Sequence, residues 1–292
     1  MVRVQILLDR AGFSPGEIDG KQGKNLTKAI EAFQKAHQLP DNGKLTADTL
    51  KALGLDQFTE PLNSYTITDQ DTAGPFTDEI PEDPMEQAKL PALNYTSVIE
   101  ELGEKFHCNP NLLKLFNPQS QFSSGDVIEV PNLSTNPNPD DQTQATNQTP
   151  AANSSPRDLI LVVSEDSADV ILKDSNDDIL FFAPATVGSE HDPLPKGDWR
   201  VTVITRNPVF HYNPDLFWDA DPSNTKTKIA AGPNNPVGVV WIGVNAPHYG
   251  LHGTPEPGLI GHSQSHGCIR MTNWDALRLA SLIQKGIHVI FQ

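Results

Sequence analysis

The feature that most constrains this chain is a long stretch without large apolar side chains near its middle. From Ser134 to Pro156 the residues are almost entirely Asn, Thr, Pro, Gln, Ser, Asp and Ala. A segment of this composition cannot bury enough apolar surface to form a core. The 292-residue chain must therefore fold as separate units on either side, and we predict a flexible linker over residues 133–156. Such a tether would leave the angle between the flanking units free.

Charge and cysteine content narrow the class of protein. The formal net charge is -16 and no run rich in Lys and Arg offsets it, which argues against a nucleic-acid partner. Two cysteines are too few for a disulfide framework, so we predict free thiols at Cys108 and Cys268, with Cys108 buried. No stretch has the length of a membrane span, and the sequence from Met1 lacks a signal-peptide pattern.

Residues 1–56 carry apolar side chains at helical spacing. Two sets recur at i, i+3, i+4 and i+7, and Thr46 can cap a third helix. The order V-Q-I-L-L, G-F-S-P-G-E-I-D-G, A-I-E-A-F-Q-K and T-L-K-A-L-G resembles the peptidoglycan-binding helical module. A generic three-helix cap is the alternative. The periodic positions are Val4, Leu7, Leu8 and Ala11, then Leu26, Ala29, Ile30 and Phe33, then Leu50 and Leu53.

Residues 62–132 predict a second unit with the order strand, helix, helix, strand. Strand patterns at residues 65–68 and 127–131 flank two helical patterns, and Pro110 opens the second of these. This order, with N-P after the second helix and G-D-V-I-E-V-P at the end, resembles a LysM glycan-binding module. The long acidic insertion around residues 78–84 departs from that family, which turns quickly from strand to helix.

From residue 157 to 292 short strands dominate the pattern. These runs are rich in β-branched and aromatic residues and are separated by turns. We expect a β-rich sandwich or curled sheet with Cys268 at a strand-to-helix corner, and hence a multidomain α+β fold for the whole chain. The predicted strands are residues 159–163, 168–172, 179–182, 199–204, 237–242 and 287–291.

The segment Tyr249–Met271, Y-G-L-H-G-T-P-E-P-G-L-I-G-H-S-Q-S-H-G-C-I-R-M, carries the candidate chemistry. Cys268 is the candidate nucleophile, and an ordinary thiol is only a few per cent thiolate at neutral pH, so a base is required. His252 and His266 are both candidates for it. Gly267 permits a close backbone turn that would aim the N–H groups of Gly267 and Cys268 at an oxyanion.

Here the motifs resemble a known family. Y-G-L-H-G-T and S-x-S-H-G-C-I-R-M, with upstream A-T-V-G, P-K-G-D-W and N-P-V-G-V-V-W-I-G, resemble the L,D-transpeptidase catalytic domain of the YkuD family over residues 157–292. The resemblance implies acyl transfer on peptidoglycan stem peptides: the cysteine attacks a carbonyl, D-alanine leaves, and an amine resolves the thioester. The resemblance implies that the reaction needs no cofactor and no metal.

The resemblance also assigns roles by position. Cys268 would be the nucleophile and His252 the base, with the carbonyl of Gly253 orienting the imidazole, while His266 and Gly267 would line the oxyanion region. For substrate binding we predict Arg270, whose fork of donors suits a carboxylate, together with Ser265 and Tyr249. Tyr249 is also a candidate packing residue beside the site.

Two alternatives remain open at this point. His248, His252, His262 and His266 could hold zinc in a cell-wall peptidase or amidase, since His262 and His266 would meet at helical i, i+4 spacing. The chain could also be a non-catalytic wall-binding scaffold. Our preferred interpretation is a periplasmic or extracellular, cell-wall-associated L,D-transpeptidase that binds peptidoglycan stems and glycan strands and reacts with carbapenem-type inhibitors. The acceptor amine stays undetermined.

Overall fold

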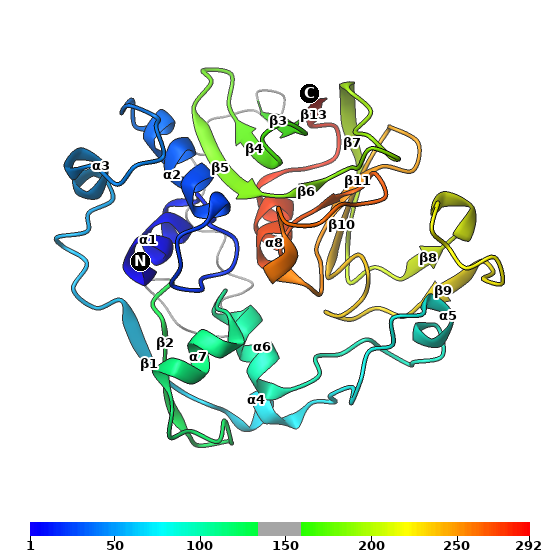
Figure 1. The fold of residues 1–292 in the computed structure, drawn as a ribbon, viewed down its shortest axis with the longest axis horizontal. Coiled ribbons are helices and arrows are strands. Elements are labelled where there is room, and N and C mark those ends of the chain that lie inside the picture. The colour runs from blue at the N-terminus through cyan, green and yellow to red at the C-terminus, as the bar shows by residue number, and fades with distance from the viewer. Residues whose placement is uncertain (134–158) are drawn as a thin grey trace.

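A computed structural model describes residues 1–133 and 159–292 (Figure 1). The predicted linker lies outside the described residues, apart from Leu133. Across those described ranges, no helix is both long and apolar enough to span a membrane.

The N-terminal helical module consists of α1 (Val2–Ala11), α2 (Lys24–Ala36) and α3 (Ala47–Ala52). Gly12 ends α1 in the left-handed conformation, with φ 91°. Thr46 caps α3, as its position predicted: its hydroxyl oxygen accepts a hydrogen bond from the Thr49 N–H at 3.2 Å. Apolar side chains from the predicted helix faces fill the core, including Leu8, Leu26, Ala29, Ile30 and Phe33.

The second module pairs its first and last strands. β1 (Leu62–Thr66) and β2 (Val127–Pro131) are antiparallel, with Tyr65 opposite Ile128. Between them lie α4 (Asp69–Ala73), α5 (Pro84–Gln87), α6 (Val98–Lys105) and α7 (Pro110–Phe116). The two predicted helices and the last strand are present, whereas the first strand covers residues 62–66 instead of the predicted 65–68. α4 precedes the acidic insertion, and α5 begins at its end. Cys108 is a free, buried thiol, as predicted, and burial raises its pKa.

The C-terminal domain is built on nine hydrogen-bonded strands in the order β5-β4-β3-β13-β7-β10-β11-β12-β6. The long strand β7 pairs with β13 through its first half and with β10 through its second half, so the sheet folds over on itself. The predicted β-rich sandwich is therefore confirmed. Its strands are β3 (Ile160–Ser164), β4 (Asp169–Lys173), β5 (Ile179–Pro184), β6 (Thr186–Val187), β7 (Gly197–Arg206), β10 (Val240–Val244), β11 (Gly250–His252), β12 (Ile269–Arg270) and β13 (His288–Phe291).

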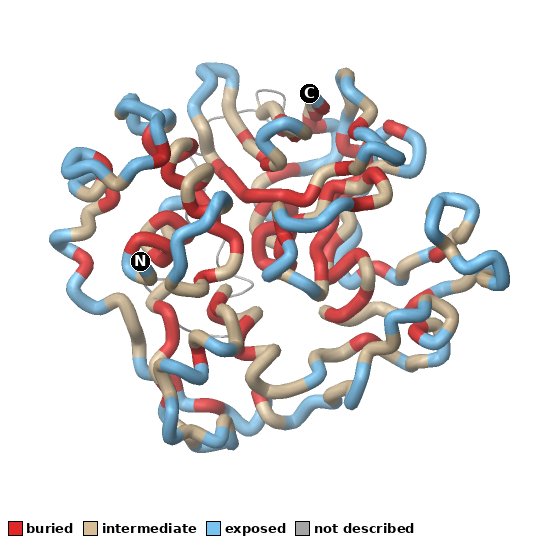
Figure 2. The backbone as a smooth tube through the Cα atoms, in the orientation of Figure 1, coloured by how far each residue is buried: buried red, intermediate tan, exposed pale blue. Residues whose placement is uncertain are grey.

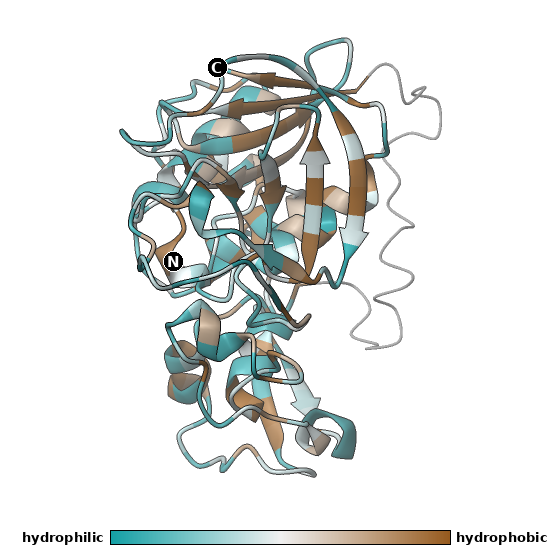
Figure 3. Cartoon of the chain, turned by 90° about the vertical axis from the view of Figure 1, so that its right-hand side faces the viewer, coloured by the Kyte–Doolittle hydropathy of each residue, from teal (hydrophilic) through white to brown (hydrophobic). Residues whose placement is uncertain are grey.

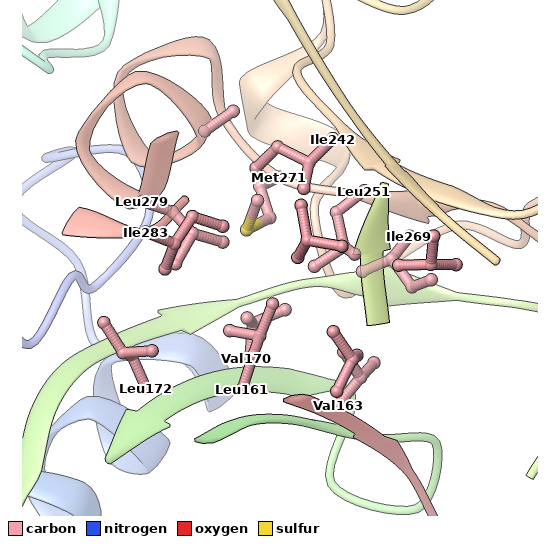
Figure 4. Packing of buried hydrophobic residues seen from close by; sticks show 14 of the residues in the cluster. Leu161, Val163, Val170, Leu172, Ile242, Leu251, Ile269, Met271, Leu279 and Ile283 are labelled. Carbon is pink, nitrogen blue, oxygen red and sulfur yellow. The ribbon is translucent and has the colours of Figure 1, made fainter. Parts of the chain in front are cut away.

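The two halves of this sheet enclose one apolar core. Leu161, Val163, Val170 and Leu172 of one half face the side chains of the other half (Figure 4). The helix α8 (Asn273–Leu282) closes the core. Buried residues line this region as well as the helical module (Figure 2), and hydrophobic positions follow the strands of the sheet (Figure 3). The facing residues are Ile242, Leu251, Ile269 and Met271, with Leu279 and Ile283 beside them.

One predicted strand begins later than expected. The run from residue 237 to 242 was predicted as strand throughout, but β10 starts only at Val240. Gly238 has a left-handed φ of 60°, and the N–H of Val239 donates to the Asn273 side chain instead of a strand partner. The first three residues therefore belong to a turn.

A separate hairpin, β8 (Phe210–Tyr212) with β9 (Thr227–Ile229), projects from the sandwich. The short helix η3 (Pro214–Leu216) lies in its tip, and a second short helix, η4 (Pro257–Leu259), lies between β11 and β12. Figure 1 shows α5 of the second module beside this hairpin.

Both N-terminal modules pack against the sandwich, whereas a free angle was expected. Phe182 of β5 is buried in the core of the helical module, and its backbone exchanges 2.9 Å hydrogen bonds with Gly12 and Ser14. The second module stacks the His107 ring on Trp274 of α8, with 5.1 Å between ring centroids. The flexible-tether prediction thus missed two interfaces.

Candidate active site

Cys268 lies at the corner that the sequence predicted. It directly precedes β12, and Met271 and Thr272 lead from β12 into α8. β12 runs parallel to β11, with Ile269 beside Leu251 and Arg270 beside His252. Side chains alternate along a strand, so Cys268, Arg270 and His252 project from the same face. The fold therefore places the predicted nucleophile and base on one face of the paired strands β11 and β12.

His252 is held as a neutral base. Its side chain is 3% exposed, and its Nδ1 lies 2.6 Å from the carbonyl oxygen of Gly253. A carbonyl can only accept, so Nδ1 carries the proton and Nε2 keeps the lone pair. Burial, reinforced by the charge of Arg270, lowers the pKa of His252 to about 3. The ring also stacks on Trp241, with centroids 5.7 Å apart.

Cys268 is a neutral thiol in the resting site. Burial raises its pKa to about 11, although a hydrogen bond from the Gly250 N–H and the charge of Arg270 act in the opposite direction. Sγ lies 3.6 Å from the carbonyl oxygen of His248. From the sequence, a histidine that keeps the sulfur ionised was expected. The structure instead favours transfer of the thiol proton as the sulfur attacks.

Backbone conformation and lack of space both require glycine at position 267. Its φ is 95°, and a Cβ at this position would lie 2.9 Å from Cε1 of Tyr249. The Tyr249 ring thus packs on the backbone beside Cys268, and its hydroxyl donates to the Pro193 carbonyl at 3.2 Å. This contact supports the packing role, while the substrate role of Tyr249 stays a prediction.

Ser265 is placed differently from the prediction. It was expected to bind substrate, but it is 3% exposed and its hydroxyl donates to the backbone carbonyl of Cys268 at 2.6 Å. Its own N–H donates to the Gly188 carbonyl at 3.0 Å. A buried side chain with these bonds holds the shape of the loop and is not available to an incoming ligand.

His266 is engaged by a residue that the sequence did not single out. Its Nε2 lies 2.7 Å from Oδ1 of Asp219, in the loop between β8 and β9. Phe217 and Trp218 from the same loop lie against the ring, at centroid distances of 4.8 and 5.7 Å. The hairpin loop therefore reaches the Cys268 segment. Only the acidic and aromatic run F-W-D could have signalled this contact.

Arg270 stands beside both candidate catalytic groups. It is partly buried, and burial lowers the pKa of its guanidinium, while Cys268, Glu256 and Asp219 favour the charged form. Its proposed contact with a substrate carboxylate remains a prediction.

The zinc alternative depended on a helix that is not formed. His262 and His266 lie in turns and bends, so no helix brings these two side chains onto one face. His262 is exposed, whereas His266 pairs with Asp219. Among the residues that the structure describes, no group of three or more metal-binding side chains was found.

Comparison with known families gives this site its class. Residues 158–290 match the family model described as the L,D-transpeptidase catalytic domain, and residues 1–53 match the one described as "Putative peptidoglycan binding domain". The chain therefore carries an L,D-transpeptidase catalytic domain behind a peptidoglycan-binding module, and both resemblances drawn from the motifs are confirmed. The LysM resemblance of residues 62–132 stays a prediction.

Two relatives matched by sequence agree with this assignment. "Putative L,D-transpeptidase YkuD" of Bacillus licheniformis is 47% identical over 57 residues, which cover 20% of this chain and 34% of that protein. "Putative L,D-transpeptidase YqjB" of Bacillus subtilis is 34% identical over 109 residues, 35% of this chain and 54% of that protein. The chain thus spans between a third and just over half of these relatives. A solved L,D-transpeptidase from Mycobacterium smegmatis has a TM-score of 0.37 at 20% identity, covering 46% of this chain and 58% of that one.

Proposed function

We propose that this protein is a cysteine-dependent L,D-transpeptidase that acts on peptidoglycan stem peptides. One observation carries the proposal. Within a domain that matches the L,D-transpeptidase family model, the Gly253 carbonyl fixes a neutral His252 as an Nδ1–H tautomer on the face that also carries Cys268. A buried base with a free Nε2 beside a thiol is the arrangement that thiol acyl transfer requires.

The first half-reaction forms the thioester. Sγ of Cys268 attacks the carbonyl carbon of the acyl donor while its proton passes to Nε2 of His252. The C–S bond forms and the carbonyl becomes an oxyanion, which the backbone N–H groups at Gly267 and Cys268 are proposed to stabilise. Collapse of this intermediate breaks the C–N bond, and the proton on His252 goes to the departing amine of D-alanine.

The second half-reaction restores the enzyme. An amine of another stem attacks the thioester carbon and gives its proton to Nε2 of His252. Sγ leaves and takes that proton back, so the thiol and the neutral imidazole return to their starting state. Because the pKa is about 11 for Cys268 and about 3 for His252, both groups rest neutral, and the proton moves to His252 only during each attack.

His266 is assigned a role separate from the base. Its Nε2 faces Asp219 and its ring packs on Phe217 and Trp218. We therefore assign His266 to shaping the oxyanion side of the site, and His252 to the proton. His252→Ala should remove acylation more completely than His266→Ala, and the reverse order would exchange the two roles.

The decisive experiment supplies disaccharide-tetrapeptides to the purified protein and identifies the products by mass spectrometry. Release of D-alanine with formation of cross-linked dimer is expected, and Cys268→Ala should abolish both. A carbapenem should leave an adduct on Cys268 that intact-mass analysis detects. Unmodified protein after long exposure, or activity that a chelator removes and Cys268→Ala does not, would favour the metal peptidase instead.

We further propose that the first two modules hold the enzyme on the wall, outside the cytoplasm. Because the formal net charge is -16, attraction to acidic wall polymers cannot supply this affinity. Binding to purified sacculi should therefore survive moderate salt, and loss of binding on raising salt would contradict shape-based recognition.

A further inference from the structure

Asn273, the first residue of α8, lies between the second module and the catalytic histidine. It is 1% exposed, so each polar atom of its amide needs a partner. Oδ1 accepts from the Val239 N–H at 3.1 Å. Nδ2 lies 3.2 Å from the Pro233 carbonyl and 3.3 Å from Oε1 of Glu104 on α6. The amide therefore joins three segments that are far apart in the sequence.

The same amide supports the peptide that orients His252. A Cβ built on Gly253 would lie 2.1 Å from Oδ1 of Asn273, so the amide packs directly on the Gly253 backbone. The carbonyl of Gly253 accepts the Nδ1–H of His252 at 2.6 Å. A shift of Asn273 would displace this peptide and with it the imidazole.

The second module contacts the surrounding segment as well. Asn234, next to Pro233, donates to Oε1 of Glu100 and to the carbonyl of Asn94, both at 2.8 Å. Backbone bonds join Leu93 to Ala231 at 3.1 Å and Asn234 to Leu93 at 3.0 Å. These bonds hold the segment between β9 and β10 in place. Asn273 forms hydrogen bonds with the same segment, at Pro233 and Val239.

We propose that Glu104 of the second module is a positioning residue for catalysis, acting through Asn273 and Gly253 on the orientation of His252. The inference rests on the proposed function of Cys268 and His252, and it assigns to the second module a role in the reaction besides wall binding. The module would then be part of the catalytic unit.

The chemistry of Glu104 suggests how to test this role. Burial raises its pKa to about 8, so at neutral pH the group is largely protonated, and its carbonyl oxygen can still accept from Asn273. Glutamine keeps such an oxygen at nearly the same place. Methionine fills a similar volume and offers only the weak acceptor of its thioether, and replacing a buried acid by an apolar side chain of similar size is often close to neutral for stability.

The experiment uses the full chain and compares Glu104→Met with Glu104→Gln. Glu101→Ala is the matched control, because its carboxylate lies on the same helix and interacts with Asp71 and Lys105 of its own module. Three quantities are measured: kcat and KM for the tetrapeptide donor, the melting temperature, and the exchange rate of the His252 Nδ1–H by NMR.

Glu104→Met should lower kcat about tenfold, since small misplacements of a catalytic group have effects of this size or larger. KM should change less than about twofold, and the His252 Nδ1–H should exchange faster. Glu104→Gln and Glu101→Ala should keep the wild-type kcat, KM and exchange rate. A folded Glu104→Met with wild-type kcat and proton exchange would overturn the inference and leave the proposed function standing. A wild-type protein that forms no thioester would end the proposed function, and the NMR comparison would still decide the inference.

Discussion

The two N-terminal modules dock on the catalytic domain through different kinds of contact. The helical module buries Phe182 of β5 in its own core and adds backbone hydrogen bonds at Gly12 and Ser14. The second module adds hydrogen bonds from side-chain amides and carboxyl groups, with Asn234 on Glu100 and Asn273 on Glu104, to the apolar cluster of Leu93, Tyr212 and Ile229. The first interface borders the outer strand of the sheet, and the second borders the peptide that orients His252.

This difference separates anchoring from positioning. Apolar burial is strong but tolerates small displacements, because it depends on the area removed from water. Hydrogen bonds between buried side chains depend on geometry. They weaken when the donor and acceptor move apart by a few tenths of an ångström or when the donor no longer points at the acceptor. We therefore expect damage at the first interface to change stability, and damage at the second to change activity as well.

The largest expected effect tests the apolar interface. Phe182→Ala should lower the free energy of unfolding by about 3–5 kcal/mol, the usual result of truncating a buried Phe. Phe181→Ala is the matched control, because Phe181 neighbours Phe182 on β5 but points into the sandwich core. Thermal denaturation and the rate of Cys268 acylation are measured at a temperature where both variants are folded.

The two variants should then differ in acylation. Phe182→Ala should acylate within about twofold of wild type, since the sandwich core is intact, while Phe181→Ala should slow the reaction by disturbing the layer beneath β11 and β12. Equal loss of activity in both variants would show that the helical module also contributes to the site.

Much of the sandwich and the position of the nucleophile could be predicted, because short sequence patterns there match the strands and turns that form. Alternating β-branched runs give the strands, and a Gly-rich corner before an apolar helix locates Cys268. The late start of β10 could not be predicted, because Val237 to Val239 resemble a strand. Only the tertiary contact of Asn273 shows why they form a turn.

The rest of the site depends on contacts between distant parts of the chain. Asp219 lies 47 positions from His266, and Glu104 lies 169 positions from Asn273. In sequence each resembles an ordinary solvated acid. Ser265 next to the S-H-G-C motif suggested a ligand contact, yet its hydroxyl faces the Cys268 carbonyl. Sequence thus indicated which residue types carry the chemistry but not which groups hold them in place.

An intermediate effect is expected where the second module touches the segment from β9 to β10. A Cβ on Gly232 would lie 2.1 Å from the Leu93 carbonyl oxygen, and the φ of Gly232 is 150°. Gly232→Ala should cost about 2–4 kcal/mol from strain and overpacking together. Gly23→Ala is the control, because its Cβ would have no heavy atom within 4 Å.

The activity of these two alanine variants tests whether the second interface affects catalysis as well as stability. Gly232→Ala should also lower kcat, since separating Leu93 from the hairpin segment loosens the surroundings of Asn273. Gly23→Ala, at the N-cap of α2, should cost at most about 1 kcal/mol and leave kcat unchanged. Chemical denaturation with urea and steady-state kinetics provide both readings. A Gly232→Ala protein that is destabilised but fully active would assign a purely structural role to the second interface.

Per unit of pH, the smallest effect is a dependence of stability on pH that differs between the interfaces. Asp275 of α8 accepts from the hydroxyls of Thr272 at 2.7 Å and of Ser14 at 2.8 Å, and burial raises its pKa to about 7, with Asp9 acting in the same direction and His107 against it. A folded-state pKa above the unfolded value of 3.8 means that the folded protein binds the proton more tightly. This contribution to stability is therefore complete below about pH 4 and is lost as the pH rises through 7.

Glu104 gives the corresponding window at the second interface, from its ordinary value of 4.5 up to about 8. Each group should lower stability by at most about 1.4 kcal/mol per pH unit within its window. Urea midpoints measured from pH 4 to 9 should show a decline that Asp275→Asn reduces below pH 7 and that Glu104→Gln reduces up to pH 8. Curves parallel to wild type in both variants would mean that neither carboxyl binds its proton more tightly in the folded protein. Loss of the decline in Asp275→Asn alone would place the pH response in the anchoring interface, and the positioning interface would then be insensitive to pH.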